Sequence, residues 1–242
     1  MRIIVEKDYQ AMSKKAALLL AGQIGLKPNS VIGLATGSTP LGMYEELISM
    51  YRNGDLDFSE VTTFNLDEYY GLSADNDQSY HFYMQENFFK DVNIKADNIL
   101  IPDGMANNVE KECKDYENEI KSKGGIDFQV LGIGANGHIG FNEPDERLNV
   151  ATSIVDLTEE TISDNSRFFE SMDMVPKKAI SMGMATILKA RRIILLASGE
   201  NKAEAIKETV NGFISTDTPS SLLQTHPDVT LVIDEAAASL IK

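Results

Sequence analysis

The sequence has one cysteine and three histidines, and its 22 basic residues stand against 37 acidic ones, for a net charge of −15. The single thiol, Cys113, excludes a disulfide within the chain and a cysteine metal cluster. The acidic balance, without any basic arm, argues against a nucleic-acid partner. No apolar run is long enough to span a membrane, and the residues after Met1 lack a signal-peptide core. We therefore expect a cytoplasmic protein with no membrane or nucleic-acid partner.

No linker rich in proline, glycine or serine divides the 242 residues, so we expect one domain over 1–242. Short apolar runs predict strands at 31–35, 61–66, 126–133, 192–197 and 229–233. Helical spacing predicts helices at 8–24, 40–52, 78–89, 108–122, 200–211 and 234–240. This alternation predicts a Rossmann-like, three-layer α/β/α fold, with an open, mainly parallel sheet and helices on both faces. The polar, irregular stretch at about 150–180 is the candidate lid.

The most informative stretch is 131–144, LGIGANGHIGFNEP, which closes an apolar run. Its glycine spacing imitates a dinucleotide fingerprint, but no amphipathic helix follows, so we reject that interpretation. His138 has a carboxylate, Glu143, five residues on and Asn136 two residues before it. A histidine held by a carboxylate is an oriented acid/base. Metal binding is the competing interpretation, and because no second histidine lies nearby we expect no metal.

A second motif, GLATGSTP at 33–40, ends a predicted strand and begins a predicted helix. The backbone N–H groups of Gly37, Ser38 and Thr39, with two hydroxyls and the helix dipole, favour an anion such as phosphate. The motif is not a Walker A loop, because no lysine follows the glycine. A plain helix cap supplied by Ser38 or Thr39 is the alternative, and the two interpretations are compatible.

Two acidic residues, Asp67 and Glu68, come just after the strand predicted at 61–66. Ligands of open α/β sheets bind at the carboxyl ends of strands, and a partly desolvated carboxylate there can be a general base. An acidic helix cap or a solvated loop is the plain alternative. The adjacent pair Tyr69 and Tyr70 favours a lined cleft.

Two basic residues stand out by position. Arg167 lies in the candidate lid, and Lys202 lies in the first turn of a predicted helix after a strand. The helix dipole disfavours a cation there unless an anion is also bound. Both residues are therefore candidates for an anion site, and for Lys202 simple exposure is the alternative.

Together these motifs resemble the glucosamine-6-phosphate deaminase (isomerase) family, in order along nearly the whole chain. The resemblance rests on ATGSTP at 35–40, FNLDEYYGL at 64–72, GIGANGHIGFNEP from 132, NSRFF at 165–169 and SGENKA at 198–203. It implies the reversible conversion of glucosamine 6-phosphate and water to fructose 6-phosphate and ammonia. The enzyme would be a hydrolase of amino-sugar catabolism, in N-acetylglucosamine and sialic acid degradation, with no metal or redox cofactor.

The resemblance also implies a role for each motif residue. The phosphate of the sugar would be held by Gly37, Ser38, Thr39, Arg167 and Lys202. Asp67 would be the base that moves a proton from C2 to C1. His138 would be the acid/base that opens the pyranose ring, with Glu143 holding its tautomer and charge. Many members have an aspartate where this chain has Asn136, which can assist ring opening by hydrogen bonds but not as a charged partner.

Long, allosteric members of the family carry basic residues shortly after FNEP and an extended C-terminus. The corresponding residues 151–155 hold no cation here, and the chain stops at Lys242. We therefore expect a short, non-allosteric form without a regulatory N-acetylglucosamine 6-phosphate site. A monomer is expected in place of the hexamer, with a small homo-oligomer as the alternative. A 6-phosphogluconolactonase-like hydrolase and a non-catalytic sugar-phosphate sensor on the same fold stay open as alternative functions.

Overall fold

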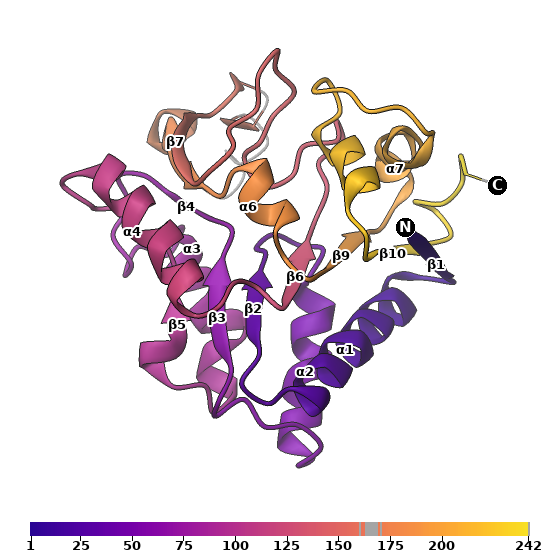
Figure 1. Cartoon of the computed structure of the whole chain (residues 1–242), viewed down its shortest axis with the longest axis horizontal. Coiled ribbons are helices and arrows are strands. Elements are labelled where there is room, and N and C mark those ends of the chain that lie inside the picture. The colour runs from indigo at the N-terminus through magenta and orange to yellow at the C-terminus, as the bar shows by residue number, and fades with distance from the viewer. Residues whose placement is uncertain (160, 163–168, 170, 242) are drawn as a thin grey trace.

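The computed structural model describes residues 1–159, 161, 162, 169 and 171–241 (Figure 1). A seven-stranded sheet in the order β1-β10-β9-β6-β2-β3-β5 forms its centre. Every neighbouring pair of strands in this sheet is parallel. Because β1 and β5 are its two edges, the sheet is open, as the sequence predicts.

Apart from the helix at 234–240, the predicted elements fall close to the expected ranges, whereas three of the elements below, at 2–6, 99–100 and 184–188, were not predicted. The strands of the large sheet are β1 (Arg2–Glu6), β2 (Val31–Leu34), β3 (Thr62–Asn65), β5 (Ile99–Leu100), β6 (Phe128–Leu131), β9 (Arg192–Ala197) and β10 (Val229–Asp234). The α-helices described are α1 (Tyr9–Leu26), α2 (Leu41–Arg52), α3 (Tyr80–Asn87), α4 (Val109–Ser122), α6 (Met184–Leu188) and α7 (Ala203–Val210). None of these helices has the length and apolarity needed to cross a membrane.

Two apolar clusters cover the two faces of the sheet. On one face, Ile32, Phe128 and Leu196 pack with apolar side chains of α1, α2 and α3. On the other face, Leu131 and Leu195 pack with apolar side chains of α4, α6 and α7. Strands that are buried on both sides read as continuous apolar runs, which is why the sequence predicted them well. The three layers of the expected α/β/α fold are therefore present (Figure 1).

A second, three-stranded sheet lies beyond the end of the large one. It consists of β4 (Asp67–Tyr69), β8 (Lys178–Ser181) and β7 (Ser153–Asp156), in that order and antiparallel. The sequence did not predict it, because its strands lack the continuous buried apolar run that marks the central strands of the large sheet. The stretch at 150–180 thus begins and ends in regular structure. That it acts as a lid stays a prediction.

The helix predicted at 234–240 is wrong, because this stretch forms successive turns. The turns start at Asp234, whose carboxylate accepts the backbone N–H of Ala237 and whose carbonyl accepts that of Ala238. Strand β1 was also missed. It is an edge strand whose Ile3 and Val5 are exposed, so it lacks the buried apolar run that marked the central strands.

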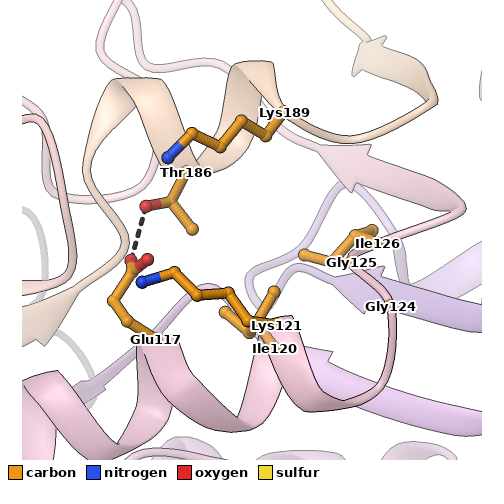
Figure 2. A pocket seen from close by; sticks show the side chains of 8 residues that line it. All are labelled: Glu117, Ile120, Lys121, Gly124, Gly125, Ile126, Thr186 and Lys189. Atoms are coloured by element: carbon orange, nitrogen blue, oxygen red, sulfur yellow. Dashed lines mark hydrogen bonds between the residues drawn. The ribbon is translucent and has the colours of Figure 1, made fainter.

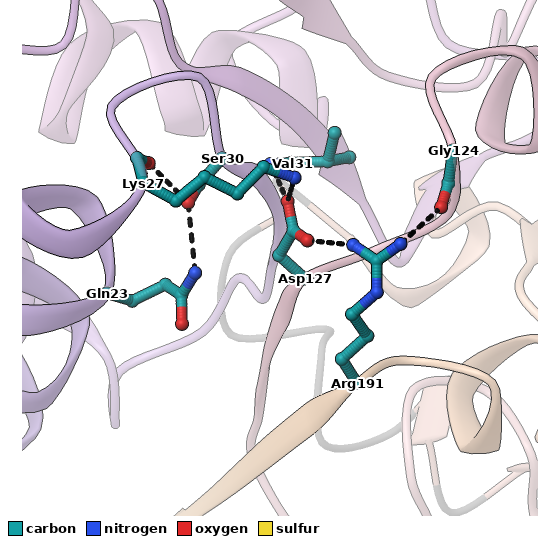
Figure 3. A network of polar contacts seen from close by, with 7 residues as sticks. All are labelled: Gln23, Lys27, Ser30, Val31, Gly124, Asp127 and Arg191. Atoms are coloured by element: carbon teal, nitrogen blue, oxygen red, sulfur yellow. Dashed lines mark hydrogen bonds and ion pairs between the residues drawn. The ribbon is translucent and has the colours of Figure 1, made fainter.

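A buried carboxylate, Asp127, joins the beginnings of two strands (Figure 3). It accepts hydrogen bonds from Lys27 Nζ at 2.6 Å and from the backbone N–H of Val31 at 2.8 Å. It also pairs with the guanidinium of Arg191, which comes just before β9. Burial alone raises the pKa of Asp127, but the bonds from Lys27, Val31 and Arg191 outweigh it and the net shift is downward. These contacts fix the amino ends of the strands relative to one another, at the opposite end of the sheet from the motif that carries His138.

A cavity of about 310 Å³ lies between α4, α6 and the start of β6 (Figure 2). Beside it, Glu117 accepts hydrogen bonds from the hydroxyls of Thr152 and Thr186, which ties α4 to the neighbourhoods of β7 and α6. Lys121 and Lys189 extend along its two sides toward Glu117. The cavity opens at the amino end of β6, whereas the motif that carries His138 follows the carboxyl end.

Candidate active site

The carboxyl ends of four neighbouring strands, β9, β6, β2 and β3, lie at the same end of the sheet, and each of these strands is followed by a predicted site residue. The turn at 36–40 follows β2, and the 132–144 motif follows β6. Asp67 comes two residues after β3, and Lys202 lies five residues after β9. Adjacent parallel strands bring their carboxyl ends together, so the topology gathers motifs that are far apart in sequence. Figure 1 shows β2, β3 and β6 running in one direction, toward β4, β7 and α6.

The turn after β2 is held by two tyrosines. Gly37 has a φ of +94°, a conformation that glycine adopts without strain. Its carbonyl accepts the hydroxyl of Tyr83 at 2.6 Å, and the carbonyl of Ser38 accepts the hydroxyl of Tyr9 at 3.0 Å. Helix α2 is capped by no side chain, since Pro40 occupies its N-cap position. The alternative in which Ser38 or Thr39 caps the helix is therefore wrong.

Asp67 is buried at the start of β4, with 6% of its surface exposed. Among the described residues, no hydrogen bond reaches its carboxylate, in contrast to the other buried acids of the fold. Burial, and to a lesser extent the charge of Glu68, raise the pKa of Asp67 to about 8. A carboxyl in such a place exchanges its proton near neutral pH, which is what a general base requires.

The neighbouring Glu68 has a different environment. Its carboxylate accepts the backbone N–H groups of Tyr69, Tyr80 and His81 at 2.8–2.9 Å, and the last two begin helix α3. Burial still leaves the pKa of Glu68 above its ordinary value. The plain interpretation of an acidic helix cap thus holds for Glu68, whereas Asp67 has no such structural partner among the described residues.

His138 and Glu143 form the pair that the motif predicted. His138 Nδ1 lies 3.2 Å from Glu143 Oε2, which is ion-pair distance, although the N–H direction is not aligned for a hydrogen bond. Burial raises the pKa of Glu143, but the nearby imidazole of His138, then Thr161 and Asn136, outweigh it and lower the pKa to about 2. Glu143 is therefore an ionised partner for the imidazole throughout the physiological range.

Asn136 connects the two members of this pair. Its side-chain amide donates to Glu143 Oε2 at 2.9 Å, and its carbonyl oxygen accepts the backbone N–H of His138 at 3.1 Å. An aspartate would lack the N–H donor that makes the first of these bonds. The expected helper role for Asn136 in orienting His138 stays a prediction, and this geometry is consistent with it.

The 139–142 turn places Asp67 against the same motif. A Cβ added at Gly140 would lie 3.2 Å from Asp67 Oδ2 and 3.3 Å from the hydroxyl of Ser181. Ser181 accepts the backbone N–H of Phe141, and the amide of Asn142 donates to the carbonyls of Ile139 and Met182. Asn142 is thus an anchor for the turn, and Asp67 faces a motif that also carries His138.

Of the two predicted cations, Lys202 lies in the described part of the chain. Lys202 is half-buried at the end of a short 3₁₀ turn, Glu200–Lys202, directly before α7. That segment is tied to β10, because the hydroxyl of Ser198 and the backbone N–H of Gly199 donate to Asp234. Arg167 lies outside the described residues, so its predicted phosphate contact stays a prediction.

Two residues near this site were missed by sequence reasoning. Ser181 clips the 139–142 turn, and the hydroxyl of Thr161 donates to Glu143 Oε1 at 2.6 Å. Thr161 belongs to the polar stretch at 150–180 and Ser181 follows that stretch directly, and neither residue is part of a motif or of an apolar periodic pattern. The pairing of β8 with β4 places Ser181, and Thr161 reaches the site through its hydrogen bond to Glu143.

The family described as glucosamine-6-phosphate isomerases/6-phosphogluconolactonase matches this chain over residues 7–232. Together with the fold and the gathered strand ends, this match defines the class: the chain belongs to that family. Among its relatives, the glucosamine-6-phosphate deaminase of Halothermothrix orenii is 70% identical, and that of Alkaliphilus metalliredigens is 62% identical. In both cases the comparison covers 100% of each chain. The particular members that match this chain from end to end are therefore glucosamine-6-phosphate deaminases.

Solved structures agree with this placement. A monomeric glucosamine-6-phosphate deaminase superposes with a TM-score of 0.96 at 48% identity, covering 99% of this chain and 100% of that one. The 6-phosphogluconolactonase from Trypanosoma brucei gives a TM-score of 0.79 at 20% identity, covering 100% and 98%. The second likeness is one of fold alone.

Proposed function

We propose that this protein converts glucosamine 6-phosphate and water to fructose 6-phosphate and ammonia, reversibly, as a step in amino-sugar catabolism. The observation that carries the proposal is the meeting of two groups in one site. One is Asp67, a buried carboxyl with a pKa of about 8, and the other is a histidine beside an ionised carboxylate. Sugar isomerisation needs both a base at carbon and an acid/base at the ring oxygen.

The phosphate would sit at the turn after β2. The backbone N–H groups of Gly37, Ser38 and Thr39 lie ahead of α2, and the hydroxyls of Ser38 and Thr39 cap no helix, which supports this placement. Lys202 and Arg167 would supply the positive charge that binds the phosphate in a chain of net negative charge. The chain holds its substrate by the group furthest from the reacting carbons, which fixes orientation without hindering the chemistry.

Ring opening would use His138. The imidazole takes the proton of the anomeric hydroxyl and returns a proton to the ring oxygen as the C1–O5 bond breaks. Glu143 stabilises the imidazolium that forms in between, and Asn136 keeps the carboxylate in place. A positioned acid/base of this kind contributes roughly 10²–10⁴-fold in rate.

Proton transfer between carbons would use Asp67. Its carboxylate takes the C2 proton of the open aldehyde while the C2 ammonium gives one proton to O1, and it then returns the C2 proton to C1 of the resulting enol-amine, which leaves an iminium at C2. Water hydrolyses that iminium to the ketone and ammonia, so the reaction cleaves a C–N bond with water. The substrate ammonium also favours the ionised form of Asp67, because an opposite charge nearby lowers the pKa of a carboxyl.

Ammonia release from glucosamine 6-phosphate tests the proposal directly. The wild-type protein should release ammonia and form fructose 6-phosphate in equal amounts. The Asp67→Asn variant should bind the substrate but neither turn it over nor exchange its C2 proton with solvent. Hydrolysis of 6-phosphogluconolactone without ammonia release would instead support a lactonase, and binding without turnover would support a sensor.

We also propose a cytoplasmic monomer without allosteric control. The solved deaminase at 48% identity is described as monomeric, which supports this assignment. Light scattering on the purified protein should give the mass of one 26.7 kDa chain. Its saturation curve should be hyperbolic and should not change when N-acetylglucosamine 6-phosphate is added.

A further inference from the structure

The carboxylate of Glu143 is held from two sides. Oε2 accepts the amide of Asn136 and faces His138, both within the 131–144 motif. Oε1 accepts the hydroxyl of Thr161, at 2.6 Å. Thr161 lies 18 residues further along the chain than Glu143 and belongs to none of the motifs that define the site.

The direction of this contact is fixed by the groups themselves. An ionised carboxylate has no proton to give, so the hydroxyl proton of Thr161 points to Glu143. The oxygen of Thr161 is then free to accept, and it accepts the hydroxyl of Thr158 at 3.0 Å. The backbone N–H of Thr161 in turn donates to Thr158 Oγ1 at 3.2 Å. Two threonines thus form an oriented chain of donors that ends on Glu143.

The turn that carries these threonines is anchored to the fold. The backbone N–H of Leu157 donates to the carbonyl of Lys177, the residue before β8. Leu157 and Ile162 pack with Tyr69, which lies two residues after Asp67, and with Phe141, which lies three residues after His138. Thr161 is only 9% exposed, so its hydroxyl has little water with which to exchange its bond.

We propose that Thr161 is a positioning residue for the His138–Glu143 pair. Its hydroxyl holds the outer oxygen of the Glu143 carboxylate, and this keeps the inner oxygen facing His138 during ring opening. The inference rests on the proposed function, since the pair needs this orientation only if His138 moves protons. The orientation of the pair therefore depends on Thr161 as well as on the residues of the 131–144 motif.

The contact has an electrostatic consequence as well. A hydrogen bond to the charged form of a carboxyl lowers its pKa, and Thr161 is one of the groups that hold the pKa of Glu143 at about 2. Removing the hydroxyl raises that pKa. Thr161 thus helps to keep Glu143 ionised beside His138.

The test compares Thr161→Val with Thr161→Ser. Valine keeps the shape and loses the donor, so kcat for glucosamine 6-phosphate should fall roughly tenfold, as expected for a lost hydrogen bond to a charged group. The KM for glucosamine 6-phosphate should stay close to the wild-type value, because Thr161 acts on the pair and not on the substrate. Serine keeps the donor and should restore the rate. Thr158→Val, in the same turn but without contact to Glu143, should have a smaller effect.

A further measurement separates positioning from binding. The amino-alditol 6-phosphate made by reducing the substrate is already open, so its affinity does not depend on ring opening. It should bind Thr161→Val and wild type equally. If Thr161→Val has wild-type kcat while His138→Gln is impaired, the role of Thr161 is wrong and the proposed function stands. If the wild-type protein releases no ammonia, the proposed function itself is wrong.

Discussion

Gly134 lies directly beneath the ring of His138, and a Cβ added there would lie 2.3 Å from both Cε1 and Nδ1 of the imidazole. The φ of Gly134 is not positive, so the glycine is needed for space and not for backbone conformation. The absence of a side chain at this position thus sets the height of the imidazole above the strand end, and with it the distance from Nδ1 to Glu143.

Gly134→Ala should therefore displace the imidazole without unfolding the chain. We expect kcat to fall by about 10²-fold, because a shift of about 1 Å in a catalytic group costs that much. The melting temperature should change by only a few degrees, since the His138 side chain is 29% exposed and can move outward. Gly132→Ala is the matched control, because a Cβ there meets nothing within 4 Å. Equal losses in both variants would contradict this explanation.

The pH dependence of activity should follow Asp67. Only its ionised form can take the C2 proton, and with a pKa of about 8 it is ionised in about a tenth of free molecules at pH 7. We expect kcat/KM to rise from pH 6 to about 8. The rise in kcat should occur at lower pH, because the bound ammonium favours the ionised carboxylate. Coincident profiles for the two constants would argue against an ammonium close to Asp67.

Asp67 should also destabilise the fold that it serves. Its pKa is raised in the folded state, from an ordinary value of 3.8 to about 8, so the unfolded chain loses this proton first as pH rises. Its contribution to stability is therefore greatest below pH 4 and declines between pH 4 and 8. Asp67→Asn should be inactive yet more stable at pH 8, by at least about 1 kcal/mol.

Denaturant unfolding of Asp67→Asn at pH 5 and pH 8 measures this effect. The gain in the free energy of unfolding should be larger at pH 8. Asp75→Asn, at an exposed position in the following loop, should show no such gain. A gain that is the same at both pH values would mean that ionisation of Asp67 is not its cause.

The contacts of Asp127 at the amino ends of the strands give a prediction about stability alone. Asp127→Ala removes the acceptor for Lys27, Arg191 and the buried backbone N–H of Val31. We expect a loss of about 2–4 kcal/mol, because buried donors are left without a partner. Arg191→Ala removes a cation whose side chain is 61% exposed, so its loss should be under about 1 kcal/mol. Similar losses from the two variants, measured by urea unfolding, would contradict this ranking.

The sequence predicted the large sheet well because its central strands are buried on both faces. Val31–Leu34 and Arg192–Ala197 are almost wholly apolar, as is typical of strands covered on both faces. The small sheet escaped prediction for the opposite reason. Lys178–Ser181 is a strand because it pairs with Ser153–Asp156 on one side and, on the other, with Asp67–Tyr69, more than a hundred residues earlier. Its own four residues carry no periodic signal.

The candidate site shows the same division. The motif brought His138, Glu143 and Asn136 to attention because unusual residues crowd into a short stretch, and the structure brings these three together. Composition could not separate Asp67 from Glu68, which stand side by side in sequence. Only the backbone of α3, which satisfies Glu68 alone, distinguishes them. Nor could any local pattern single out Thr161, whose contact with Glu143 depends on the path of the chain after β7.

The pairing of β1 with β10 has a consequence for folding during synthesis. Arg2 pairs with Thr230, so β1 is synthesised long before β10 and cannot form its pairing until β10 has left the ribosome. Throughout synthesis its apolar Ile3 and Val5 stay available to other nascent chains. A permuted gene that encodes β1 directly after β10 would turn this long-range closure into a local one, and the refolding of its product should be faster.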